Sequence, residues 1–99
     1  MDNPKERRRE RAQRRQELLK VKRKLEGRMA KAETLIEESE LEKSSIVTAL
    51  ASPAAALDFA ALNRRLKELE DGVLKATEDW ESATAELEPV QLEYDNIHE

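Results

Sequence analysis

The sequence has no cysteine and is poor in glycine, proline and aromatic residues, and each shortage argues against a class of protein. Without cysteine there is no disulfide framework, no thiol nucleophile and no cysteine-based zinc site. Two glycines, three prolines and 3% aromatic residues leave a sheet without its usual turns and a layered core without its large side chains. No apolar run approaches the roughly 18 residues of a membrane span, and the charged N-terminus does not suit a signal peptide. We therefore expect a cytoplasmic protein with no membrane partner.

Charged residues are abundant and make up 40% of the 99 residues, while alanine and leucine contribute 13 each. A bias towards Ala, Glu, Lys, Leu and Arg is typical of long helices and coiled coils when apolar residues recur every three or four positions. Without that spacing, the same composition would border on disorder. The spacing of the apolar residues therefore decides between a coiled coil and a disordered chain.

The second half of the chain carries an unbroken heptad repeat. The steps alternate between three and four through Phe59, Leu62, Leu66, Leu69, Val73, Ala76, Trp80, Ala83, Leu87, Val90, Tyr94 and Ile97. Such a repeat predicts a helix whose apolar seam faces one partner in a left-handed coiled coil. Pro89 removes a backbone hydrogen bond and clashes with the preceding turn, at about 3 kcal/mol. We expect a kink or the end of the main helix there, with a frayed extension over 89–99.

A less regular stripe in the first half predicts another long helix. Its members are Leu18, Val21, Leu25, Met29, Ala32, Ile36, Ser39, Lys43, Ile46 and Leu50, and Leu19, Leu35, Leu41 and Val47 flank them. The chain before Leu18 is almost entirely polar. Residues 1–17 are therefore expected to form a basic arm or linker, partly helical or disordered, with Pro4 in a first helical turn.

The only break between the two stripes lies at 51–58, where Ser52 and Pro53 can form a turn and Asp58 can cap the next helix. A short connection makes two long helices antiparallel neighbours. We predict an all-α fold in which 18–88 form two long helices in an antiparallel coiled-coil hairpin. The numbers of facing residues should add to about 112. The hairpin favours a monomer, and the competing arrangement is a dimer of one continuous helix kinked at Pro53.

The net charge of -4 conceals a basic and an acidic part. Residues 1–31 carry 13 basic and 5 acidic side chains, whereas 32–99 carry 5 basic and 17 acidic ones. A basic run of this density is typical of phosphate binding, to which arginine is well suited. The candidate nucleic-acid-binding residues are Lys5, Arg7, Arg8, Arg9, Arg11, Arg14, Arg15, Lys20, Lys22, Arg23 and Lys24.

The same basic run has a second interpretation, which is pairing within the hairpin. In the expected register it lies along Glu81, Glu86, Glu88, Glu93, Asp95 and Glu99, and such pairs help to select an antiparallel partner. Residues 1–12 would project beyond the second helix, with Lys5, Arg7, Arg8, Arg9 and Arg11 free. Arg14 and Arg15 would lie at a frayed margin. No aromatic residue is interleaved with the run, so binding should be driven by phosphates and have no sequence preference.

Residues suited to catalysis or metal binding are sparse. Asp95 and His98 could supply two metal ligands, fewer than the three or four of a usual site. Ser44 and Ser45 lack a general base, and the glutamates of 37–42 suit a solvated face. Trp80 suits the core. We expect no enzyme activity, no metal and no cofactor.

Short motifs punctuate the expected hairpin: Glu42-Lys43, Ala51-Ser52-Pro53 with Asp58, Leu62 to Leu66, Trp80-Glu81, and Glu86-Leu87-Glu88. Over 15–88 this pattern resembles the C-terminal coiled-coil domain of the ABC-F ATP-binding-cassette ATPases, including the Uup-like members. Two features depart from the family: Ser52 stands where an aspartate is usual, and the tail after Pro89 runs past the usual end.

The resemblance implies a non-catalytic accessory domain that follows two ATP-binding cassettes in proteins acting on the ribosome. It also implies an arm that contacts ribosomal RNA or DNA. The sequence has no G-x-x-x-x-G-K-[ST] phosphate loop, because Gly27 and Gly72 are isolated. The cassettes would therefore lie elsewhere in a longer chain. The alternative is a structural or oligomerising coiled coil with no nucleic-acid role.

Overall fold

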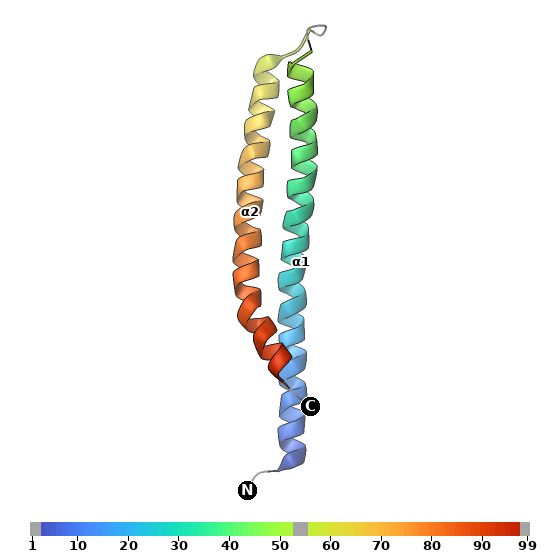
Figure 1. Ribbon diagram of the computed structural model, residues 1–99, viewed down its shortest axis with the longest axis vertical. Helices are drawn as coiled ribbons and strands as arrows, with labels where there is room; N and C mark the ends of the chain where they lie inside the picture. The colour runs from blue at the N-terminus through green and yellow to red at the C-terminus, as the bar shows by residue number, and fades with distance from the viewer. Residues whose placement is uncertain (1–2, 53–55, 98–99) are drawn as a thin grey trace.

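The computed structural model describes residues 3–52 and 56–97, which form two long helices. Helix α1 spans Pro4–Leu50 and helix α2 spans Phe59–Asn96. The two helices pack side by side and antiparallel in a rod 81 Å long and 15 Å across (Figure 1). No strand occurs in the described ranges. The predicted all-α helical hairpin is confirmed.

Each helix begins at a side-chain cap. The side chain of Asn3 accepts a hydrogen bond of 3.0 Å from the backbone N–H of Lys5, and Pro4 occupies the first turn. The side chain of Asp58 accepts one of 3.0 Å from the backbone N–H of Ala61. Such caps satisfy backbone donors that lack a partner within the helix and contribute about 1 kcal/mol each.

The helix ends agree with the expected turn. α1 ends at Leu50 and α2 begins at Phe59, so the connection covers the predicted 51–58, and the N-cap role predicted for Asp58 is confirmed. Pro53, which we expected to begin the turn, lies outside the described residues.

The core is a seam of side chains with a period of seven residues on both helices. The buried residues of α1 are Leu18, Leu25, Ala32, Ser39 and Ile46. A half-buried residue follows each of them by four positions: Lys22, Met29, Ile36, Lys43 and Leu50. In α2 the seam continues from Leu62 to Tyr94. Leu69, Ala76 and Ala83 are buried, and its other members are half-buried, as is the cap residue Ile97. This alternation is the pattern of knobs-into-holes packing.

The predicted seam was wrong at one position of α1. Val21 is 45% exposed, and the seam position belongs to Lys22. The side chain of Lys22 is only 22% exposed, and its ammonium lies 5.6 Å from the centroid of the Tyr94 ring. The aliphatic stem of lysine can pack along a seam while its charged end meets an aromatic face.

The seam is also narrower than predicted. Among the residues expected to widen it, Leu35, Leu41 and Val47 are 40%, 69% and 56% exposed. Phe59, predicted as the first member of the α2 seam, is 53% exposed, so the prediction was wrong there and the seam begins at Leu62. Two slender helices leave one strip of mutual contact, and residues that flank this strip stay in solvent.

The cross-helix contacts agree with the expected register. Residue numbers add to 107 for the contact of Arg14 with Glu93 and to 116 for Lys22 with Tyr94, which bracket the expected value near 112. The indole N–H of Trp80 donates a hydrogen bond of 2.8 Å to Glu33, next to the buried Ala32 that we expected to face it.

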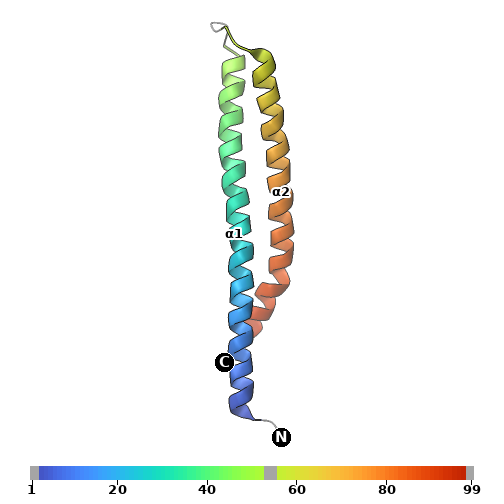
Figure 2. The same ribbon diagram turned by 180° about the vertical axis from the view of Figure 1, so that it is seen from behind.

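α2 passes through Pro89 without ending. The frayed extension that we expected is helical up to Asn96, and both views show α2 changing direction in its last turns and leaning onto α1 (Figures 1 and 2). Val90, Tyr94 and Ile97 are half-buried after the proline, so burial of their side chains offsets the missing hydrogen bond. Residues 4–17, expected to be only partly helical, likewise belong to α1.

Candidate nucleic-acid interface

The basic part of the chain is one continuous stretch of α1. Arginine, lysine, glutamate and glutamine are all good helix formers, and they dominate residues 4–17. These residues are therefore helical although they have no apolar core of their own. The first turns of α1 project beyond the end of α2 (Figure 1). The helix therefore holds these cations at fixed spacings, and the question is which of them contact carboxylates of the hairpin.

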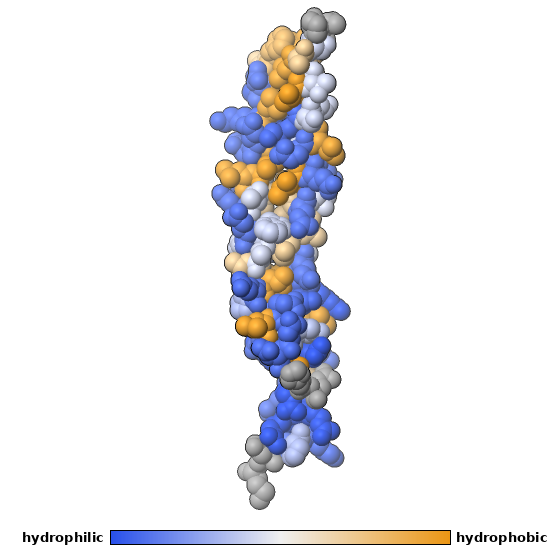
Figure 3. Space-filling view, in the orientation of Figure 1, coloured by the Kyte–Doolittle hydropathy of each residue, from blue (hydrophilic) through white to orange (hydrophobic). Residues whose placement is uncertain are grey.

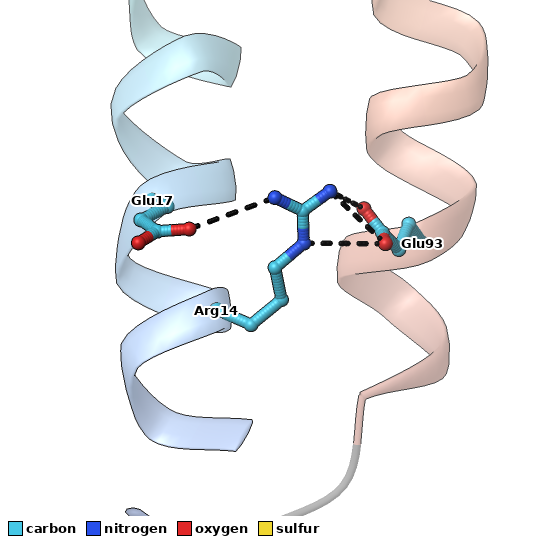
Figure 4. Close-up of polar contacts among 3 residues, drawn as sticks. All are labelled: Arg14, Glu17 and Glu93. Atoms are coloured by element: carbon cyan, nitrogen blue, oxygen red, sulfur yellow. Dashed lines mark hydrogen bonds and ion pairs between the residues drawn. The ribbon is translucent and has the colours of Figure 1, made fainter. Parts of the chain in front are cut away.

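Arg14 of α1 is bound to Glu93 of α2. Its Nη2 lies 2.7 Å from Oε2 of Glu93, its Nε donates to Oε1 of the same carboxylate at 3.2 Å, and its Nη1 lies 3.6 Å from Glu17 (Figure 4). The hydrogen bonds to Glu93 raise the pKa of the guanidinium. Because this bidentate pair occupies most of the donor fork, Arg14 is not available to a phosphate unless Glu93 releases it.

Arg15 is also engaged. Its Nη2 donates a hydrogen bond of 3.1 Å to the Tyr94 hydroxyl, its Nη1 donates one of 3.4 Å to the carbonyl of Ile97, and its guanidinium lies 4.4 Å from the centre of the Tyr94 ring. Together with Lys22 on the same ring, this contact fixes the last turn of α2 on α1. The expectation that Arg14 and Arg15 lie at a frayed margin is therefore corrected.

Two further arginines form ion pairs between the helices along the flank that carries Arg14. Arg28 donates to Asp79 at 2.7 Å and to Glu86 at 2.9 Å. The hydrogen bond to Asp79 contributes most to raising the pKa of the Arg28 guanidinium, and the one to Glu86 comes second. Arg65 of α2 binds Glu42 of α1 with both its Nε and its Nη2. The sequence analysis did not single out Arg28, although its spacing of 14 residues from Arg14, two full heptads, signals the same flank.

The remaining candidates lie on the surface. Among the residues that the structure describes, no ion pair or hydrogen bond engages the side chains of Lys5, Arg8, Arg9, Arg11, Lys20, Arg23 and Lys24, all of which are exposed. Arg7 is exposed as well. The projecting end of α1 is predominantly hydrophilic on the face that Figure 3 shows. Of the eleven predicted residues, Arg14, Arg15 and Lys22 thus serve the hairpin, and seven are exposed cations available to a ligand.

Other chemistry finds little support in the described part of the chain. It contains no group of three or more His, Cys, Asp or Glu placed to hold a metal, and His98 lies outside it. The hollows are open surface grooves, such as the one between Arg11 of α1 and Ile97 at the end of α2. Within the described ranges, neither helix is apolar over a stretch long enough to cross a membrane.

Comparisons of the chain with protein-family models, with curated proteins and with solved structures gave no match. The resemblance to the ABC-F C-terminal domain therefore stays a prediction, and the arrangement of charges on α1 is the observation from which a function can be argued.

Proposed function

We propose that the hairpin is a non-catalytic accessory arm that binds nucleic acid by its phosphates, with the projecting end of α1 as one point of contact. The single observation that supports the proposal most is that Lys5, Arg8 and Arg11 are exposed and unpaired among the described residues. They lie on a rigid helix, with Lys5 and Arg8 beyond the end of α2 and Arg11 beside it, and no carboxylate among the described residues forms an ion pair with them.

The physical reason is the contrast between these cations and their neighbours. Arg14 and Arg28 form the ion pairs that hold α2. The charges of Lys5, Arg8 and Arg11 are not used in this way. Three further cations outside those pairs only repel one another unless an anion is present. A polyanion gains binding free energy from them by releasing its condensed counterions.

The resemblance to the ABC-F C-terminal domain gives the proposal a setting. It implies ribosomal RNA or DNA as the nucleic acid and ATP-binding cassettes in the same polypeptide. Reading the genomic sequence upstream for two in-frame cassettes tests that setting, and their absence would confine the proposal to the hairpin itself.

Fluorescence anisotropy with duplex DNA, single-stranded DNA and structured RNA at two salt concentrations tests the binding. In the arm variant, Lys5→Ala, Arg8→Ala and Arg11→Ala are combined. We expect weaker binding to all sequences and a salt slope smaller by up to about 3, since each phosphate contact contributes about 0.9.

The matched control removes three exposed cations from α2 by Arg64→Ala, Lys67→Ala and Lys75→Ala. Both variants lose the same charge, so a non-specific effect of net charge would weaken them equally. Equal losses, or no binding of the unaltered chain at low salt, would refute the proposal. Light scattering addresses the alternative, because an oligomerising coiled coil predicts a dimer where the hairpin predicts a monomer.

A further inference from the structure

A second basic surface runs along α1 on the side opposite the seam. The exposed cations and polar residues on this outer face, from Arg9 to Lys31, form the outer stripe: Arg9, Gln13, Gln16, Lys20, Arg23, Lys24, Gly27 and Lys31. Two acidic residues, Glu10 and Glu17, lie on the same face, at the heptad position of Lys24 and Lys31, and Glu17 is 3.6 Å from Arg14.

The side chains of the stripe have no partners within the hairpin. In the described residues no ion pair reaches Arg9, Lys20, Arg23, Lys24 or Lys31. Gln13 and Gln16 add amide donors between the cations. Since the flank of α1 already supplies the pairs that hold α2, the stripe is not needed for the fold.

The opposite side of the rod has the opposite charge. From Ala76 to its end, α2 contains no lysine or arginine, and its exposed acidic residues outside the ion pairs with α1 are Glu78, Glu81, Glu88 and Asp95. These carboxylates repel phosphates, so a polyanion can approach this half of the rod only from the side of α1. The charge distribution thus sets the orientation of a bound nucleic acid.

The shape of the stripe favours a duplex over a single strand. From Arg9 to Lys31 it spans about 33 Å at about 1.5 Å per residue, which equals about ten base pairs of DNA at 3.4 Å each. A single strand is usually held by stacking on aromatic rings, and the stripe has none. The ring of Tyr94 is covered by Arg15 and Lys22, and the indole of Trp80 donates to Glu33. A straight, rigid row of cations suits the straight axis of a duplex, along which phosphates of both strands recur, and the charge density of a duplex is also higher.

We infer that the outer stripe of α1 is a docking track about ten base pairs long on double-stranded nucleic acid, which binds phosphates of both strands where their backbones pass it. The inference deepens the proposed function and rests on it: the hairpin would lie along the duplex with α1, instead of touching it only with the projecting end. Arginine and lysine along the track contact phosphates, and recognition is independent of sequence.

The test measures binding of labelled DNA duplexes of about 6, 10 and 20 base pairs, a ten-base-pair RNA duplex and single strands of equal length. The stripe variant combines Lys20→Ala, Arg23→Ala and Lys24→Ala and is compared with the arm variant and the α2 control, each of which loses the same charge. Circular dichroism verifies that all variants stay helical. The ratio of the DNA and RNA affinities shows which kind of duplex is preferred.

We expect affinity to rise steeply up to about ten base pairs and then to level off, with single strands bound more weakly. The stripe variant should lose at least about tenfold in affinity and flatten the salt slope by up to about 3, while the α2 control changes less than about twofold. Loss of binding in the arm variant but not in the stripe variant would overturn the inference and leave the proposed function standing. Equal affinity for single strands and duplexes would overturn it as well.

The absence of any binding by the unaltered chain would overturn both proposals together. If instead light scattering at low salt detects association of two copies that the stripe variant abolishes, with no nucleic acid bound, the stripe faces the acidic α2 of a second copy and the inference is wrong.

Discussion

Replacement of Leu25 by alanine tests the seam most directly, because this side chain is 6% exposed in the part of α1 that Arg28 holds against Asp79 and Glu86. The substitution removes three carbons, and each buried CH₂ contributes about 0.8 kcal/mol, so the lost transfer free energy is about 2 to 3 kcal/mol. A rod two helices wide has no second layer to enclose a cavity, which keeps the cost near the low end of the range of about 2 to 5 kcal/mol for such changes.

The consequence is visible in a thermal melt followed by circular dichroism. A change of 1 kcal/mol shifts the Tm of a domain of this size by about 4 to 8 °C, so Leu25→Ala should lower it by about 10 to 20 °C. Leu41→Ala is the matched control: it makes the same substitution in the same helix at a side chain that is 69% exposed. Its free energy of unfolding should change by less than about 0.5 kcal/mol.

Equal shifts in the two variants would refute the reasoning, because they would mean that Leu41 is as buried as Leu25. That result requires a second chain over the outer face of α1, and it would accompany a doubled mass in sedimentation equilibrium.

Two further predictions concern the backbone and pH. Gly72 lies within α2 at negative φ, and a Cβ added there meets no atom within 4 Å, so Gly72→Ala should raise the free energy of unfolding by about 0.5 to 1 kcal/mol; a lower Tm would mean that the helices approach more closely at this point. Hydrogen bonds from Arg65 hold the pKa of Glu42 below its ordinary value of 4.5. A carboxylate whose pKa is lower in the folded state than in the unfolded state stabilises the fold at pH values above its ordinary pKa. This stabilisation is lost as the pH falls through the folded-state pKa. The Tm difference between the unaltered chain and Glu42→Gln should therefore be positive at neutral pH and vanish in strong acid, and a constant difference would contradict the pairing. Glu37→Gln, which makes the same substitution at an exposed site of the same helix, is the matched control.

Much of the fold follows from the sequence because the heptad repeat is a local signal. The repeat from Leu62 to Ile97 predicts the seam of α2, since spacing alone decides which face is buried. The choice between Val21 and Lys22 depends on the partner helix instead. Hydropathy favours valine, but strict periodicity and the ring of Tyr94 place the lysine stem in the seam. Pro89 is a similar case, because packing that follows the proline outweighs its local cost.

The candidate site was harder to predict from the sequence. Composition identifies the basic run, but only the register of the hairpin shows which cations meet carboxylates. Arg14 and Lys24 look equivalent in the sequence, yet one is bound to Glu93 and the other lies on the outer face. Lys31 belongs to the same basic run but was not among the predicted binding residues, and only the register of the helix places it on the outer face.

The antiparallel course of the helices also has a mechanical consequence. The start of α1 and the end of α2 lie together at the basic end of the rod, and the turn that joins them lies at the far end (Figure 1). A rod 81 Å long that is anchored at one end behaves as a lever. If nucleic acid fixes the basic end, a small rotation about that end moves the other end of the rod by a large distance. Residues 44–57, towards that other end, include no charged side chain. Under the proposed function, a small angle at the base of the hairpin becomes a large displacement at its tip.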